Sequence, residues 1–343
     1  MVRVETLDEV QKIKALETEL KNVKEAFANL SLRNLVLETY LEEFGKETGR
    51  TDEIKKSTHK NYPNTFRTKK VSVTAACSVF NITRPTHYKA VKALEYEEFS
   101  NAIILEMIQE CRRINKFEGG RKLFFRLKDE INRITKMGRD KFFTLLRDNK
   151  LLIERKKSST RTTDSNHPFR KYTNQIKDLT ITRKNQVWVS DITYIRTAKS
   201  FRYLSLITDL YSRKIVGYKL SNSLSIEGCI DALKGALKLW KGTEPLIHHS
   251  DRGVQYCCKE YTELLINKGI SISMTEVDHC YENACAERVN GILKQEYGLD
   301  ATFNNEQQAL KAVKEAINLY NSYRLHTSLG YKTPDSVYFA EVA

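Results

Sequence analysis

The order of apolar patterns after residue 186 constrains the fold more than any other feature of the chain. Three β-rich runs, at 186–195, 201–210 and 213–220, follow one another with short connections, as consecutive antiparallel strands do. Helices and strands then alternate: helix 225–240, strand 245–250, helix 259–268, strand 270–274 and helix 282–297. Several strands are apolar on both faces, which is typical of a sheet covered by helices on both sides. We expect an α/β core over residues 185–300, with a mixed five-stranded sheet, and a helical extension over residues 301–343.

Positive charge is concentrated in the middle of the chain. The 343 residues contain 57 Lys and Arg against 43 Asp and Glu, a net charge of +14. Residues 50–185 carry 32 basic and 15 acidic residues, whereas residues 186–343 carry 18 of each. Such a block favours nucleic acid as a partner over a merely solvated surface. No apolar stretch approaches the roughly 20 residues of a membrane span. The seven scattered cysteines match no disulfide framework and fit a reducing cytoplasm.

The first 48 residues carry a heptad repeat. Apolar residues recur at alternating spacings of three and four over more than four heptads, which predicts a coiled coil. A polar residue, Asn34, stands at an a position, where a buried Asn favours a parallel dimer in fixed register. A helix packed on its own domain is the alternative. The predicted dimer seam consists of Ile13, Leu16, Leu20, Val23, Phe27, Leu30, Asn34, Leu37 and Leu41.

Residues 67–96 have the spacing of a helix-turn-helix. An Ala-rich helix over 74–79 is followed by a short turn, and Thr83 is placed to cap a second helix with Pro85 in its first turn. A generic helical hairpin would give the same pattern. In a DNA-binding motif the second helix would present its first residues to base edges. These residues are Arg84, Thr86, His87 and Lys89.

The basic block continues through a second helical unit and a linker. Residues 97–154 predict helices at 101–115, 120–131 and 139–149, and this unit is a candidate second DNA-binding domain. Residues 155–184 have no periodicity and many Ser and Thr, so we expect a basic linker that follows a phosphate backbone. The candidate phosphate ligands in the two segments are Arg121, Lys122, Arg139, Lys141, Arg155, Lys156, Lys157, Arg161, Arg170 and Lys171.

Three acidic residues stand where local structure would expose them for chemistry. Asp191 interrupts an apolar strand, Asp251 directly follows another with Gly253 allowing a sharp turn, and Glu287 lies on the last core helix. Three converging carboxylates suit Mg²⁺ or Mn²⁺, and two such ions can promote displacement at phosphorus. On periodicity alone, three unrelated acids remain an alternative. On the same helix Asn283, Glu287, Asn290 and Lys294 share one face.

These residues lie in blocks that make the chain resemble the transposases of the insertion-sequence-three family, in the retroviral-integrase superfamily. The blocks are "WVSDITYI", "HHSDRGVQY" and "CYENACAERVNGILKQE", with 35 residues between Asp251 and Glu287. The flanking "RTTDSNHP" and "YNSYRLHTSLGYKTPDSVY" are also similar, and the likeness runs from about Val71 to the C-terminus. Two departures are mild: Ser190 replaces a usual Thr, and Glu282 replaces a usual Asp.

The resemblance implies a ribonuclease-H-like core, a catalytic triad of Asp191, Asp251 and Glu287 that binds two Mg²⁺ ions (Mn²⁺ being a substitute), and DNA strand transfer. It also implies that Lys294 contacts the terminal DNA of the element, together with Asn283 and Asn290 on the same face. A leucine zipper before the helix-turn-helix fits the family as well. Expected partners are the element ends, target DNA and further copies of the chain. Two alternatives remain: a non-catalytic dimeric DNA-binding regulator and a ribonuclease-H-like nuclease.

Overall fold

The computed structural model describes residues 7–44, 73–74, 77, 82–153, 169–242, 244–276 and 284–340. The chain forms two compact units, residues 1–103 and 104–343. The described part of the first unit holds α1 (Leu7–Phe44) and the start of α4 (Arg84–Ile114). Thr83 caps α4 as predicted, because its Oγ1 accepts a hydrogen bond from the Thr86 amide at 3.4 Å. Among the described helices, none combines the length and apolarity needed to cross a bilayer.

The sheet of the second unit is mixed, as the sequence predicts. Its strand order is β3-β2-β1-β4-β5, with β1 antiparallel to β2 and parallel to β4. A two-residue strand, β6, adds a sixth member beside the far end of β1, which the sequence pattern did not indicate. The strands are β1 (Val187–Thr197), β2 (Phe201–Asp209), β3 (Ile215–Ser221), β4 (Ile247–Ser250), β5 (Ser271–Met274) and β6 (Thr302–Phe303).

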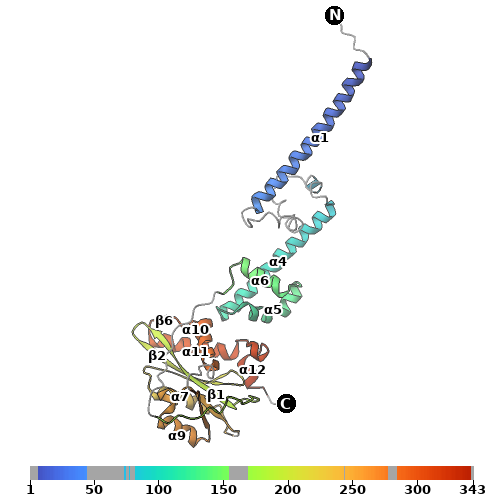
Figure 1. Ribbon diagram of the computed structural model, residues 1–343. Coiled ribbons are helices and arrows are strands. Elements are labelled where there is room, and N and C mark those ends of the chain that lie inside the picture. Colours follow the sequence, from blue (N-terminus) through green and yellow to red (C-terminus); the bar gives the residue numbers. More distant parts are fainter. Residues whose placement is uncertain are drawn as a thin grey trace. The chain divides into compact units, whose positions relative to one another are not determined.

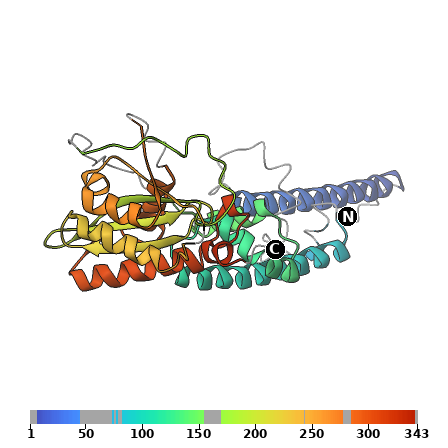
Figure 2. The ribbon, with the colours of Figure 1, turned by 90° about the horizontal axis from the view of Figure 1, so that it is seen from below.

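Helices cover both faces of this sheet (Figures 1 and 2). One face packs against α7 and α9 around Trp188, and the other packs against α10 and α11 around Ile195. This is the arrangement of a ribonuclease-H-like core, and it confirms the expected fold class. The helices are α7 (Ile226–Leu237), α8 (Val254–Cys257), α9 (Lys259–Asn267), α10 (Ala284–Glu296), α11 (Glu306–Ser322), the 3-10 helix η3 (Thr327–Leu329) and α12 (Pro334–Tyr338).

Ahead of the sheet, residues 104–153 form a helical subdomain with a core of its own. The C-terminal half of α4 packs with α5 (Gly120–Ile134) and α6 (Arg139–Asp148) around Ile108, Leu123 and Phe142. The apolar side chains of α5 recur at 123, 127 and 131, so one stripe of this helix is buried, whereas its basic residues Arg121, Lys128 and Arg133 are exposed.

Two sequence expectations about this region differ from the structure. The expected break near residue 100 is absent, because α4 runs unbroken from Arg84 to Ile114. Residues 169–184 are not a free linker, since Gln175 donates to Ser273 Oγ and to the Ile272 carbonyl beside β5. Tyr172 packs into the core as well. Apolar residues in a segment without periodicity were the signal for this packing.

Candidate active site

The pairing of β1 with β4 places two carboxylates side by side. Ser190 pairs with Ser250 in parallel register, and each is followed directly by an aspartate, Asp191 or Asp251. Gly253 has an ordinary negative φ of −65°, so a turn needing a positive φ is not the reason for the glycine. Instead, its amide donates to Asp251 Oδ1 at 3.1 Å, and a Cβ there would lie 3.1 Å from the same oxygen.

The pKa of Asp191 depends on its burial and on the other groups of the site. Burial and the negative charge of Asp251 raise the pKa of Asp191 to about 7, and Glu287 adds to the rise. Two hydrogen bonds oppose it: the Ile192 amide donates to Oδ1 at 2.9 Å, and Asn290 Nδ2 donates to Oδ2 at 2.7 Å. Three carboxylates predicted from separate segments therefore act on one another.

The shared face of α10 meets these acids. Glu287 and Lys294 both interact electrostatically with Asp191, and Asn290 is hydrogen-bonded to it. Burial lowers the pKa of Lys294, while the charges of Asp191 and Asp300 oppose that effect. The opposite face of α10 packs Ile292 and Leu293 into the core. The sequence predicted that Asn290 binds DNA, whereas in the structure its side chain donates a hydrogen bond to Asp191, a candidate catalytic residue.

The donor chemistry of the site fits a hard divalent cation. The candidate ligands offer only oxygen atoms, and Asn290 Oδ1 is buried without a hydrogen-bond partner. Mutually repelling carboxylates also favour a cation, because it would offset the charge that raises the pKa of Asp191. Within the described residues, however, no three His, Cys, Asp or Glu side chains are gathered closely enough to hold one ion. Glu287 is solvent-exposed, and residues 277–283, which precede its helix, lie outside the described part.

The two histidines before Asp251 are buried and hydrogen-bonded on opposite faces of β4, which sequence reasoning missed. Ser190 Oγ lies 2.7 Å from His248 Nε2, and the Tyr261 hydroxyl lies 2.9 Å from the same nitrogen. His249 Nδ1 lies 2.9 Å from Ser273 Oγ. Burial, with the neighbouring His249, lowers the pKa of His248 to about 3, so this ring is neutral at physiological pH. These contacts join β1 to β4 and β4 to β5 next to Asp191 and Asp251.

Eight of the candidate DNA ligands that the structure describes are exposed, and four are not: His87 and Asn290 are buried, and Lys122 and Lys294 are partly buried. His87 is 3% exposed and packs edge-on against Tyr88, so the expectation that it faces DNA is wrong. Lys122 is also wrongly assigned, because its ammonium group is 2.6 Å from Glu296 Oε2 in a shielded ion pair. The exposed candidates are Arg84, Thr86, Lys89, Arg121, Arg139, Lys141, Arg170 and Lys171. Outside the described residues lie Arg155, Lys156, Lys157, Arg161 and Asn283.

The predicted dimer seam is uncovered in the single chain. Its side chains from Ile13 to Leu30 are 44–70% exposed, and Asn34 is exposed too. The side chains of Leu37 and Leu41 are not among those that the structure describes. A stripe of large apolar residues facing water along one helix is what a missing coiled-coil partner leaves behind.

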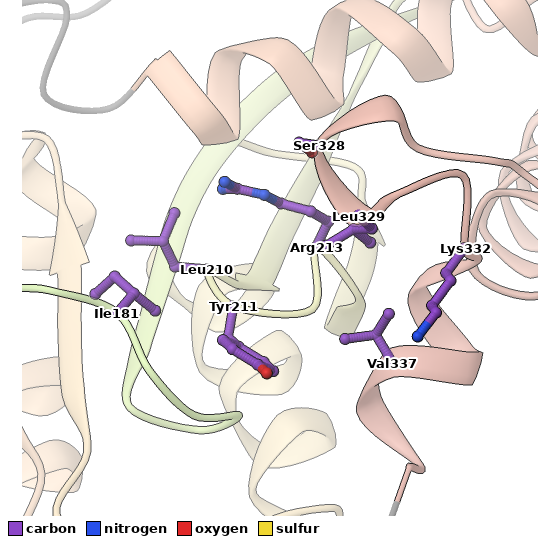
Figure 3. Close-up of a pocket in the computed structure, with 8 residues that line it drawn as sticks. All are labelled: Ile181, Leu210, Tyr211, Arg213, Ser328, Leu329, Lys332 and Val337. Atoms are coloured by element: carbon purple, nitrogen blue, oxygen red, sulfur yellow. The ribbon is translucent and has the colours of Figure 1, made fainter.

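A basic pocket of about 510 Å³ lies on the Asp191 face of the sheet (Figure 3). Ile181 and Leu210 line it, and both also pack against the cluster of Val187 and Val189. Because side chains alternate along a strand, those two valines share a face with Asp191. The cationic residues that line the pocket are Arg213 and Lys332. Arg213 also donates a hydrogen bond to Cys285 Sγ at 2.9 Å.

Comparisons with known proteins agree with this core. Two family models, each described as an integrase core domain, match residues 181–280 and 268–334. The insertion element IS600 uncharacterized 31 kDa protein of Shigella sonnei is 33% identical over 262 residues, which cover 75% of this chain and 95% of that protein. Transposase InsF for insertion sequence IS3A of Escherichia coli is 35% identical over 44% of this chain and 53% of its own length. The trimeric HTLV-2 integrase catalytic core domain, solved with magnesium, is 22% identical over 45% of this chain and 96% of its own, with a TM-score of 0.37.

Proposed function

Because this chain belongs to the insertion-sequence-three family of transposases, which are DDE polynucleotidyl transferases with an integrase core, we propose that it binds the DNA ends of its own element. There it cleaves and joins DNA strands with Mg²⁺, and Mn²⁺ substitutes. It acts as a dimer or higher oligomer assembled through α1.

One observation carries the proposal: the pairing of Ser190 with Ser250 sets Asp191 beside Asp251, and α10, the helix of Glu287, contacts Asp191 through Asn290 at 2.7 Å. Asp251, which follows β4, and Glu287 both raise the pKa of Asp191. Asp191, Asp251 and Glu287 would hold the ions. Bound Mg²⁺ would activate the attacking oxygen and stabilise the leaving oxygen of the phosphodiester.

The remaining residues of the site orient groups and attract DNA. Asn290 Nδ2 fixes Asp191 Oδ2, which leaves that carboxylate one preferred orientation. The Lys294 ammonium lies on the same helix face and offers a charge for a phosphate next to the acids. Arg213 and Lys332 extend this positive character along the Asp191 face of the sheet. A strand could therefore pass from the acids to the basic pocket.

Cleavage and joining by the full chain test the catalytic proposal. On DNA carrying the terminal repeats of the element, with Mg²⁺, we expect Glu287→Gln to lower both products by about 10³-fold or more, as loss of a charge-stabilising group does. DNA affinity should stay within about threefold, because a glutamine retains the shape. The matched control is Glu263→Gln on the exposed face of α9.

Each rival function has its own outcome in this assay. Joining that persists in Glu287→Gln would refute the triad. Binding without any metal-dependent cleavage in the wild type would leave a DNA-binding regulator. Cutting of RNA–DNA hybrids by water, with no product joined to target DNA, would identify a nuclease.

Salt dependence tests the role of the basic block. We expect affinity for element DNA to fall by about 10³–10⁵-fold between about 50 and 200 mM salt, because bound phosphates release counterions. Arg139→Gln combined with Lys141→Gln should reduce the slope of log affinity against log salt by about two, one for each lost contact. Fluorescence anisotropy on labelled duplex measures both. A flat dependence, or an unchanged slope in the double variant, would contradict the assignment.

A further inference from the structure

A shielded ion cluster joins the helical subdomain of residues 104–153 to the end of the catalytic helix. Glu296, the last residue of α10, uses both carboxylate oxygens. Arg324 forks onto them, with Nη2 at 2.7 Å from Oε1 and Nε at 2.9 Å from Oε2. Lys122 Nζ, from α5, donates to Oε2 at 2.6 Å. The three side chains are 18%, 7% and 11% exposed, in the order Glu296, Arg324, Lys122.

The two cations of this cluster hold the carboxyl group of Glu296 in its charged form. Burial opposes ionisation of Glu296, but Arg324 and Lys122 reverse the effect, so the pKa of its carboxyl is lowered. Burial lowers the pKa of Lys122, and Arg324 lowers it further, while Glu296 raises it. Two cations therefore depend on one carboxylate. Removing Glu296 would leave two shielded cations without a partner, which is far costlier than losing an exposed pair. Removing Lys122 leaves the Arg324–Glu296 pair in place and breaks the link between α5 and α10.

A second set of contacts joins α5 to the segment between α11 and α12. Glu118, fully buried, accepts from Arg126 Nη2 at 2.8 Å, and that nitrogen also donates to the Tyr323 carbonyl at 2.9 Å. The Arg126 guanidinium lies 3.8 Å from the centre of the Tyr323 ring. Phe125 stacks on Tyr331 with the ring centres 4.0 Å apart. The helical subdomain is thus docked on the core by packing and by charge, and Lys122 is its direct contact with α10.

We infer that Lys122 is a positioning residue, which ties the helical subdomain to α10 and so sets where Glu287, Asn290 and Lys294 lie against Asp191. The inference rests on the proposed function, because it assigns importance to Glu287. Glu296 is two residues from Lys294 and nine from Glu287, all on one rigid helix. A shift at the anchored end is therefore carried to the acid, and displacements of about 1 Å can cost about 10²-fold in rate.

Lys122→Met tests the inference in the full chain. We expect kcat for strand cleavage to fall by about tenfold or more, with KM for element DNA within about threefold. Amide hydrogen exchange in α10 should become faster even without DNA or metal, because the anchor is lost. Lys122→Arg, which keeps the cation, should restore most of kcat. Lys311→Met, which removes one partner of an exposed ion pair on α11, is the matched control and should change neither quantity.

The outcomes separate this inference from its rival and from the proposed function. A raised KM with unchanged kcat would show that Lys122 binds phosphate, and would overturn the inference. Unchanged kcat and unchanged exchange would overturn it as well. If Lys122→Met fails to fold, Lys122→Gln, which removes the charge and leaves the Arg324–Glu296 pair intact, takes its place with the same expectations. Failure of the proposed function appears instead as full activity in Glu287→Gln, whereas the exchange result does not depend on any activity.

Discussion

Asp191→Asn should abolish strand cleavage and yet stabilise the metal-free protein. The pKa of Asp191 is about 7 in the folded chain, against about 3.9 when it is unfolded. Between these values the folded chain keeps a proton that the unfolded chain has released, so the free energy of unfolding falls as pH rises from about 4 to 7. Above pH 7 the full penalty remains, about 2–4 kcal/mol. A neutral asparagine at position 191 carries no such penalty in the free energy of unfolding.

Urea unfolding in the presence of EDTA, from pH 5 to pH 8, measures this effect. The advantage of Asp191→Asn should be largest at pH 8 and shrink toward pH 5. Added Mg²⁺ should stabilise the wild type and leave the variant unchanged, since a ligand that binds only the folded state shifts its stability. Asp148→Asn, at an exposed position on α6, is the control. A variant that is less stable at pH 8 would mean that Asp191 is not repelled by its neighbours.

Leu20→Pro should eliminate self-association through α1. Leu20 is 53% exposed in the single chain and lies within the seam, and a proline inside a helix costs about 3 kcal/mol or more. Sedimentation velocity of the full chain should then show a smaller species than the wild type. Leu20→Asp keeps the helix but buries a charge between the two copies, so it should give the same result.

The neighbouring position provides the matched control. Lys21 lies off the seam, at a b position of the heptad, so Lys21→Asp should leave association unchanged. A dimer that survives both Leu20 variants would refute the seam. It would also mean that the exposed apolar stripe of α1 packs against something other than a second copy of α1.

The sheet and its acids could be predicted because their signals are local. Asp191 is a charge inside an apolar strand, and Asp251 ends one, so each is conspicuous in its own segment. The spacing on the last helix placed Glu287, Asn290 and Lys294 on one face, and all three interact with Asp191. Periodicity identifies a face, but it does not say which atom on the opposite element that face will meet.

The contacts that the sequence did not predict join residues far apart. Lys122 and Glu296 are 174 positions apart, and Arg126 and the Tyr323 carbonyl are 197 apart. In sequence, Lys122 is one more cation in a basic block, and only the packing of α5 shows that it is shielded from solvent. His87 is misleading for the same reason, because burial depends on what packs around the helix.

The pairing of Ser190 with Ser250 has a consequence for how length can vary in this chain. Successive side chains on a strand point to opposite faces, so inserting or deleting one residue in β1 would turn Asp191 away from α10. Extra residues between β3 and α7 would leave it in place, because that loop is outside the ladder. Active natural or engineered length variants should therefore have their insertions and deletions in loops. Inserting or deleting one residue in β1 should abolish transposition.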